Sequence, residues 1–186
     1  MGKKKKKQVF NFPLLDEKDI SNTNDVKCAS YRGKIIHYMV ELESLLDWAL
    51  MRYYIRNDEV KIYDFTHSIL GEENLMLHSK FLAISYILHN RFPSFIPTHS
   101  YFLTTFDELI TLRNKVAHLK MTAVFQHGNK IKYSLADVKT SGHKPKGNII
   151  YISKDELRVF YGKYNQLRKD LAEIIDLIEN GNKKEA

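Results

Sequence analysis

The feature that most constrains the fold is an apolar series near the C-terminus, whose members are spaced alternately three and four residues apart: Leu157, Phe160, Tyr164, Leu167, Leu171, Ile174 and Ile178. On an α-helix this spacing forms one stripe, which packs against other helices at about 20°. Ser153-Lys154-Asp155-Glu156, directly before the series, has the pattern of a capping box, and Gly181 is predicted to end the helix. The series therefore predicts helix-on-helix packing.

Earlier segments of the chain also carry a helical pattern. The longest follows candidate N-caps at Asn22–Asp25 and has apolar residues at steps of three and four: Ile35, Met39, Leu42, Leu46, Ala49 and Tyr53. Shorter helices are predicted for Lys61–Leu70, which stops near Gly71, for residues 73–92, and from Ser100 through Val116.

Between residues 121 and 153 the pattern changes to alternating apolar and polar residues. His127-Gly128-Asn129 is a turn signal between two strands, residues 139–147 form a second loop, and residues 148–153 form a third short strand. We therefore predict a mainly α fold. It is an up-and-down helical bundle, with a β-hairpin or three-stranded insert before the last helix, in one domain over residues 22–182.

Charge is concentrated at the N-terminus. The net charge is +7, of which Lys3–Lys7 supply five, so residues 1–21 are predicted to be a basic disordered tail. This tail has three interpretations: solubilisation, attraction to phosphate groups, or contact with a membrane surface. The chain has no apolar run of about 20 residues, so we expect no membrane span. Cys28 is the single cysteine, which leaves no disulfide within the chain and favours a cytoplasmic protein.

The stretch Arg113-Asn114-Lys115-Val116-Ala117-His118 ends an apolar helical segment with polar groups of complementary chemistry. Residues four apart share a helix face, so Asn114 and His118 lie one above the other, with Arg113 about 100° away on the flank. A guanidinium binds phosphate through a planar fork of donors, and an imidazole transfers protons near neutral pH. The stretch is therefore the candidate active site.

Here the sequence resembles the HEPN domains, whose ribonucleases carry an arginine and a histidine separated by four to six residues near the end of a helix. The long first helix and the helical bundle are also similar to that family. The resemblance implies a metal-independent endoribonuclease without a cofactor, in which Arg113, Asn114 and His118 are catalytic and two protomers form one composite cleft. It also implies a toxin or anti-phage effector with RNA as substrate. An antitoxin or another defence protein is then a candidate partner.

Other residues enter this hypothesis in lesser roles. Glu43 is a candidate accessory group, and substrate-binding lysines are expected at Lys115, Lys120, Lys130 and Lys132. Toxins controlled by a nucleotidyltransferase antitoxin carry a tyrosine two positions after the histidine. This chain has Lys120 there, so that form of regulation is not expected.

A structural role for the motif and two rival functions stay open. Arg113 and His118 are also residue types that favour a helix C-terminus, which is a purely structural reading. A second arginine and histidine pair with the same spacing, Arg32 and His37, is discounted because it lies early in the first helix and lacks the polar residue after the arginine. The rival functions are a non-catalytic HEPN-like module that binds RNA or nucleotides or serves in assembly, and a structural helical dimer. The remaining histidines have no metal-ligand spacing, so no metal site is expected.

Overall fold

A computed structural model describes residues 23–55, 58–71, 76–127, 130–136 and 149–184. The predicted tail over residues 1–21 and the loop over residues 139–147 lie outside these ranges. The helices of the described part are α1 (Thr23–Tyr54), α2 (Glu59–Phe65), the π-helical turn η2 (Thr66–Leu70), α3 (Leu77–Arg91), α4 (Phe95–Thr98), α5 (Phe102–His118) and α6 (Lys154–Lys184). The fold is mainly helical, with a small sheet before the last helix, as the sequence predicts.

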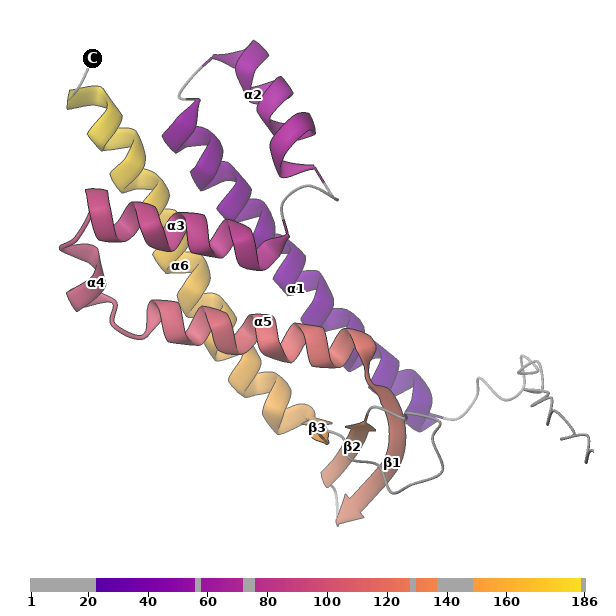
Figure 1. The fold of residues 1–186 in the computed structure, drawn as a ribbon. Coiled ribbons are helices and arrows are strands. Elements are labelled where there is room, and N and C mark those ends of the chain that lie inside the picture. Colours follow the sequence, from indigo (N-terminus) through magenta and orange to yellow (C-terminus); the bar gives the residue numbers. More distant parts are fainter. Residues whose placement is uncertain (1–22, 56–57, 72–75, 128–129, 137–148, 185–186) are drawn as a thin grey trace, which may run out of the picture.

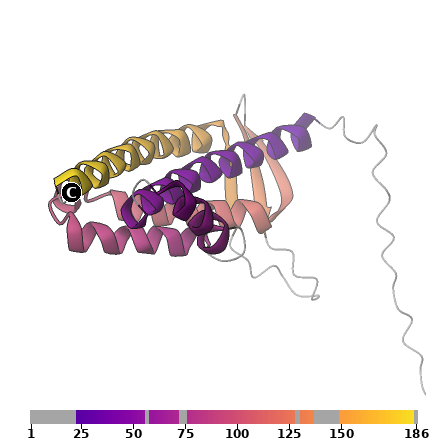
Figure 2. The ribbon, with the colours of Figure 1, turned by 90° about the horizontal axis from the view of Figure 1, so that it is seen from above.

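The helices form two layers. The long helices α1 and α6 lie side by side and run in the same direction, and α3 and α5 pack across them (Figures 1 and 2). A short segment that contains α4 joins α3 to α5. The short helix α4 was not predicted, because the proline-containing sequence of residues 93–99 is typical of a loop.

The seam between α1 and α6 contains the apolar stripes that the sequence predicts. All seven predicted members on α6 are buried, and α1 contributes Leu42, Leu46 and Ala49 with no exposed surface. Ser153 Oγ accepts hydrogen bonds from the backbone N–H groups of Asp155 and Glu156, so the predicted cap forms. The predicted stop at Gly181 is wrong, because α6 continues to Lys184. A glycine lowers helix propensity by about 1 kcal/mol but does not forbid a helix.

The sheet lies at the end of the bundle where α1 begins (Figure 1). Its strands β1 (Lys120–His127), β2 (Lys130–Ala136) and β3 (Ile150–Ser153) pair antiparallel in sequence order. β1 follows α5 almost directly, and β3 leads straight into α6. The sheet therefore connects the end of the candidate active-site helix to the start of the longest apolar seam.

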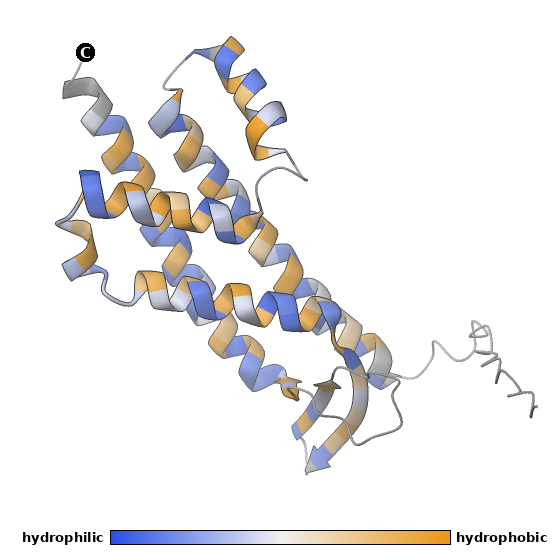
Figure 3. Ribbon diagram, viewed as in Figure 1, coloured by the Kyte–Doolittle hydropathy of each residue, from blue (hydrophilic) through white to orange (hydrophobic). Residues whose placement is uncertain are grey.

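Hydrophobic and hydrophilic residues alternate along the helices (Figure 3). In α1, α3, α5 and α6 the buried positions are mostly hydrophobic. None of the described helices is long and apolar enough to cross a membrane. Trp48 is one of several exposed apolar residues: it is 41% exposed, and the Arg52 guanidinium lies 4.4 Å from the centre of its ring.

A buried lysine joins the two layers. Lys80 of α3 is 3% exposed, and its Nζ lies 2.9 Å from a carboxylate oxygen of both Glu43 and Asp47 on α1. Burial alone would lower the pKa of Lys80, but the two hydrogen bonds and negative charges outweigh burial and raise it. For Asp47 the balance is opposite, because desolvation outweighs the attraction of Lys80 and raises the pKa of the carboxyl group. The triad therefore holds a charged lysine in the core.

We expect Lys80→Ala to destabilise the protein by about 3 kcal/mol, because it leaves two partly buried carboxylates without their cation. The free energy of unfolding in urea measures this, with Lys169→Ala on the exposed side of α6 as the control, expected within about 0.5 kcal/mol of wild type. A Lys80→Met, Glu43→Gln, Asp47→Asn variant should recover most of the loss. A loss below about 1 kcal/mol for Lys80→Ala would contradict the role of the triad.

The raised pKa of Lys80 also sets a pH dependence. Its stabilising contribution is complete below the pKa of an unfolded lysine, about 10.4, and disappears as the pH rises through the higher folded value. Wild type should therefore lose more stability above about pH 10.4 than the triple variant does.

Candidate active site at the end of α5

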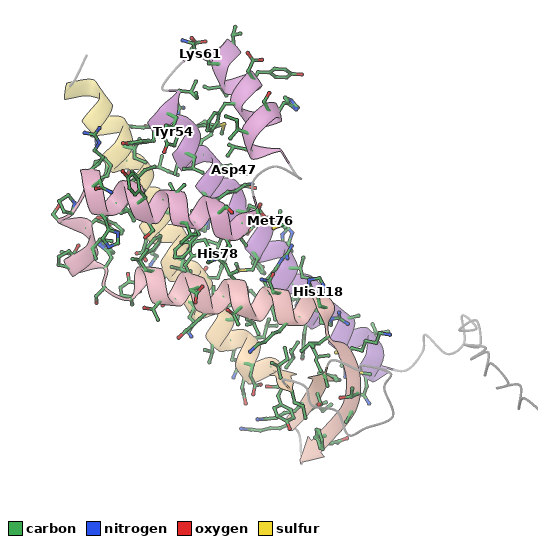
Figure 4. All side chains as sticks on the ribbon, in the orientation of Figure 1. Asp47, Tyr54, Lys61, Met76, His78 and His118 are labelled. Carbon is green, nitrogen blue, oxygen red and sulfur yellow. The ribbon has the colours of Figure 1, made fainter. Side chains whose placement is uncertain are left out.

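The end of α5 exposes one face and buries the other. Val116 is fully buried and Ile110 nearly so, which anchors the helix against the bundle. Asn114 and His118 are exposed, and Arg113 is half-buried on their flank. Figure 4 shows His118 at the last turn of α5, where the helix passes into β1. The structure therefore places the three residues at one end of α5, with Asn114 and His118 on one face and Arg113 on its flank.

The Asn114 amide interacts with the arginine of the motif. Arg113 Nη1 donates a hydrogen bond to Asn114 Oδ1 at 3.0 Å. The His118 imidazole makes no hydrogen bond or ion pair with any residue that the structure describes. Helix geometry places Asn114 on the face of His118, but in the single chain its amide bonds to the Arg113 guanidinium instead.

Arg32 on α1 reaches the end of α5, a contact that could not be predicted from the sequence. Its Nε donates to the carbonyl of Val116 at 3.0 Å, and its Nη2 contacts the carbonyl of Ala117 at 3.4 Å. The last carbonyls of a helix have no partner within the helix, and a cation is favourable there. Arg32 therefore caps the turn that carries His118.

His37, the other member of the second arginine and histidine pair, faces elsewhere. Its Nε2 lies 3.6 Å from Oε1 of Glu41, four residues along α1, and its side chain is 68% exposed. Glu41 Oε2 in turn accepts a hydrogen bond from the Tyr164 hydroxyl on α6. Burial, followed by this hydrogen bond and the negative charge of Glu41, raises the pKa of Tyr164 to about 12. Arg32 therefore contacts α5, whereas His37 contacts Glu41 within α1, so the pair does not form one site.

The predicted substrate lysines fall into two groups. Lys115 and Lys120 flank His118, the first half-buried and the second exposed. Lys130 and Lys132 lie on β2, where their Nζ atoms pair with Asp155 at 3.5 Å and Glu156 at 3.3 Å. The second group therefore belongs to the sheet rather than to the end of α5.

Glu43, the candidate accessory residue, belongs to the Lys80 triad between α1 and α3. Its contacts in the described part of the chain include none of the motif residues. No group of three or more histidine, cysteine, aspartate or glutamate residues within the described ranges is arranged to hold a metal ion.

No protein-family model, curated protein or solved structure matches the chain. The resemblance to HEPN domains therefore rests on residues 113–118 and on the helical pattern around them.

We expect Arg32→Met to destabilise the protein by about 2 kcal/mol, because two helix carbonyls lose a charged donor. Arg32→Lys should recover part of this, since an ammonium keeps the charge but lacks the planar fork. Urea denaturation measures both, with exposed Arg158→Met on α6 as the matched arginine control. Equal stability of the Arg32→Met and Arg158→Met variants would show that Arg32 does not hold the end of α5.

Proposed function

We propose that the protein is a metal-independent endoribonuclease whose active site is Arg113, Asn114 and His118. The observation that carries this proposal is a half-buried arginine that is hydrogen-bonded to an amide, together with an exposed histidine, on the last turns of one helix. The resemblance of this stretch to the HEPN ribonuclease motif supports the same reaction. It also supports a role as a toxin or anti-phage effector.

The proposed reaction is attack of an RNA 2′-hydroxyl on the adjacent phosphorus. The 2′-O–P bond forms, the P–O5′ bond breaks, and the products are a 2′,3′-cyclic phosphate and a 5′-hydroxyl. One base must accept the 2′-OH proton and one acid must protonate the leaving 5′-oxygen, and neutral and protonated imidazoles serve these two roles. Each chain offers one histidine in the motif. A homodimer with a shared cleft would supply both.

Arg113 is proposed to stabilise the charge that develops on the phosphoryl oxygens, because its guanidinium presents several fixed donors. The hydrogen bond from Arg113 to Asn114 supports a role for the amide in aiming that guanidinium. His118 remains the proton-transfer group, held in place through its helix turn, which Arg32 caps.

A non-catalytic RNA-binding module is the alternative, and one observation favours it. The described residues provide no partner that would orient the His118 imidazole, whereas a general base is usually oriented by a third group. A second protomer at the cleft would supply such a partner in the catalytic reading. Cleavage therefore decides between the two functions.

We expect the wild-type protein to cleave single-stranded RNA in EDTA, to leave DNA of the same sequence intact, and to produce cyclic phosphate ends. His118→Ala should reduce the rate at least about 100-fold, because general acid–base catalysis is lost. His37→Ala is the matched control, since His37 is an exposed histidine of the other arginine and histidine pair. Gel analysis of labelled RNA measures the rates. Full activity of His118→Ala would remove His118 from the mechanism, and a strict need for a divalent ion would end the metal-independent reading.

Arg113→Met should leave the unfolding free energy of the ligand-free protein within about 0.5 kcal/mol of wild type or raise it, because the guanidinium has only a half-exposed contact with Asn114. Sulfate should raise the melting temperature of wild type more than that of the variant. Thermal and urea unfolding with and without sulfate test this. A loss above about 2 kcal/mol would mark Arg113 as a structural residue.

A further inference from the structure

Two large aromatic side chains are exposed on the sheet. Phe125 of β1 is 53% exposed and Tyr151 of β3 is 47% exposed. Their ring centres lie 6.1 Å apart, with the rings inclined at 65°. The rings come from the two outer strands, so they meet over β2. Folding gains little from such incompletely buried rings, whereas flat aromatic surfaces are what nucleic-acid bases stack on.

A lysine lies on the same face, on the strand between the two that carry these rings. Phe125 is the cross-strand partner of Lys132, and Tyr151 is the partner of Ser134, two residues further along β2. Directly paired residues and those two apart share a sheet face. Phe125, Lys132 and Tyr151 therefore form one surface, which we call the sheet platform.

A cavity of about 270 Å³ at the edge of this sheet is lined by α1, β2, β3 and α6. Its wall includes four lysines from three of these elements, namely Lys27, Lys130, Lys132 and Lys154, which we call the lysine pocket. Lys130 and Lys132 pair with Asp155 and Glu156 at exposed positions, where such pairs contribute little stability. Lys27 and Lys154 make no ion pair with any described residue. The pocket therefore has cationic groups available for an anion.

The wider charge distribution points the same way. Over residues 23–38, 111–136 and 150–160, which surround the sheet, the chain has ten basic residues: Lys27, Arg32, Lys34, Arg113, Lys115, Lys120, Lys130, Lys132, Lys154 and Arg158. The same ranges have three acidic residues: Asp25, Asp155 and Glu156. Excess positive charge around one end of a protein attracts polyanions.

We propose that the sheet platform and the lysine pocket together bind single-stranded RNA, with bases on Phe125 and Tyr151 and backbone phosphates at the lysines. This inference rests on the proposed function and names a substrate surface outside the motif. A single strand fits because its bases are free to stack on side chains, whereas a duplex hides them. The sheet that carries this surface begins beside the motif, since β1 follows α5 after one residue.

The binding test uses His118→Ala as the background, so that RNA is not cut. A fluorescein-labelled oligouridylate of about a dozen nucleotides is titrated by anisotropy. Phe125→Ala with Tyr151→Ala should weaken binding at least about fivefold, because base stacking is lost. The matched control is Tyr63→Ala with Tyr86→Ala, two exposed aromatics on α2 and α3, which should leave affinity unchanged. Circular dichroism verifies that each variant is folded.

The charge test compares salt dependence. Lys27→Gln with Lys154→Gln should reduce the slope of log affinity against log salt by about 1.4, since each phosphate contact on a single strand contributes about 0.7. Lys61→Gln with Lys169→Gln, two lysines away from the sheet, is the control pair and should not change the slope.

The outcomes separate this inference from the proposed ribonuclease. Binding of both oligouridylate and oligothymidylate that depends on the platform supports the inference even if no cleavage occurs, because stacking and phosphate contacts do not need the 2′-hydroxyl. If the wild-type protein cleaves RNA but neither the aromatic nor the lysine substitutions change RNA affinity, the inference is overturned and the proposed ribonuclease function stands. An equal loss of RNA affinity, or an equal change in its salt dependence, in the control variants overturns the inference as well. So does preferential binding to double-stranded RNA or to vesicles of phosphatidylcholine and phosphatidylserine.

Discussion

The polar contacts of α1 fix the positions of its neighbours. Arg32 binds the last carbonyls of α5, and Glu43 and Asp47 hold the buried ammonium of Lys80 on α3. Further along the helix, Arg52 pairs with Glu179 of α6 at 3.2 Å. Apolar packing supplies most of the attraction between helices but is not directional. These charged contacts are directional, so they fix the position of each neighbouring helix along α1.

The candidate site depends on this arrangement. The turn with His118 is held by a cation from a helix 84 residues away in sequence, and its buried side is anchored by Val116. The polar side faces solvent and keeps its side chains accessible. A rigid backbone with exposed functional groups is the usual arrangement of a site that meets a large substrate.

The sequence predicted those features that local periodicity controls. The stripe of α6, its Ser153 cap and the hairpin all follow from patterns within a few residues. Features that depend on distant partners could not be predicted: the capping role of Arg32 and the triad around Lys80 each join residues more than 30 positions apart. Asn114 shows another limit of prediction from the sequence. Helix geometry places it on the face of His118, but its flexible amide bonds the adjacent Arg113.

The direct passage from α5 into β1 has a mechanical consequence. Only Leu119 separates His118 from the first residue of β1, and Leu119 is itself buried. One buried residue therefore joins the sheet to the end of the helix in place of a long flexible loop, which limits how much the interval between the two can vary. In a nuclease that anchored a strand on the sheet, this interval would act as a ruler, with cleavage at a set number of nucleotides from the anchored bases.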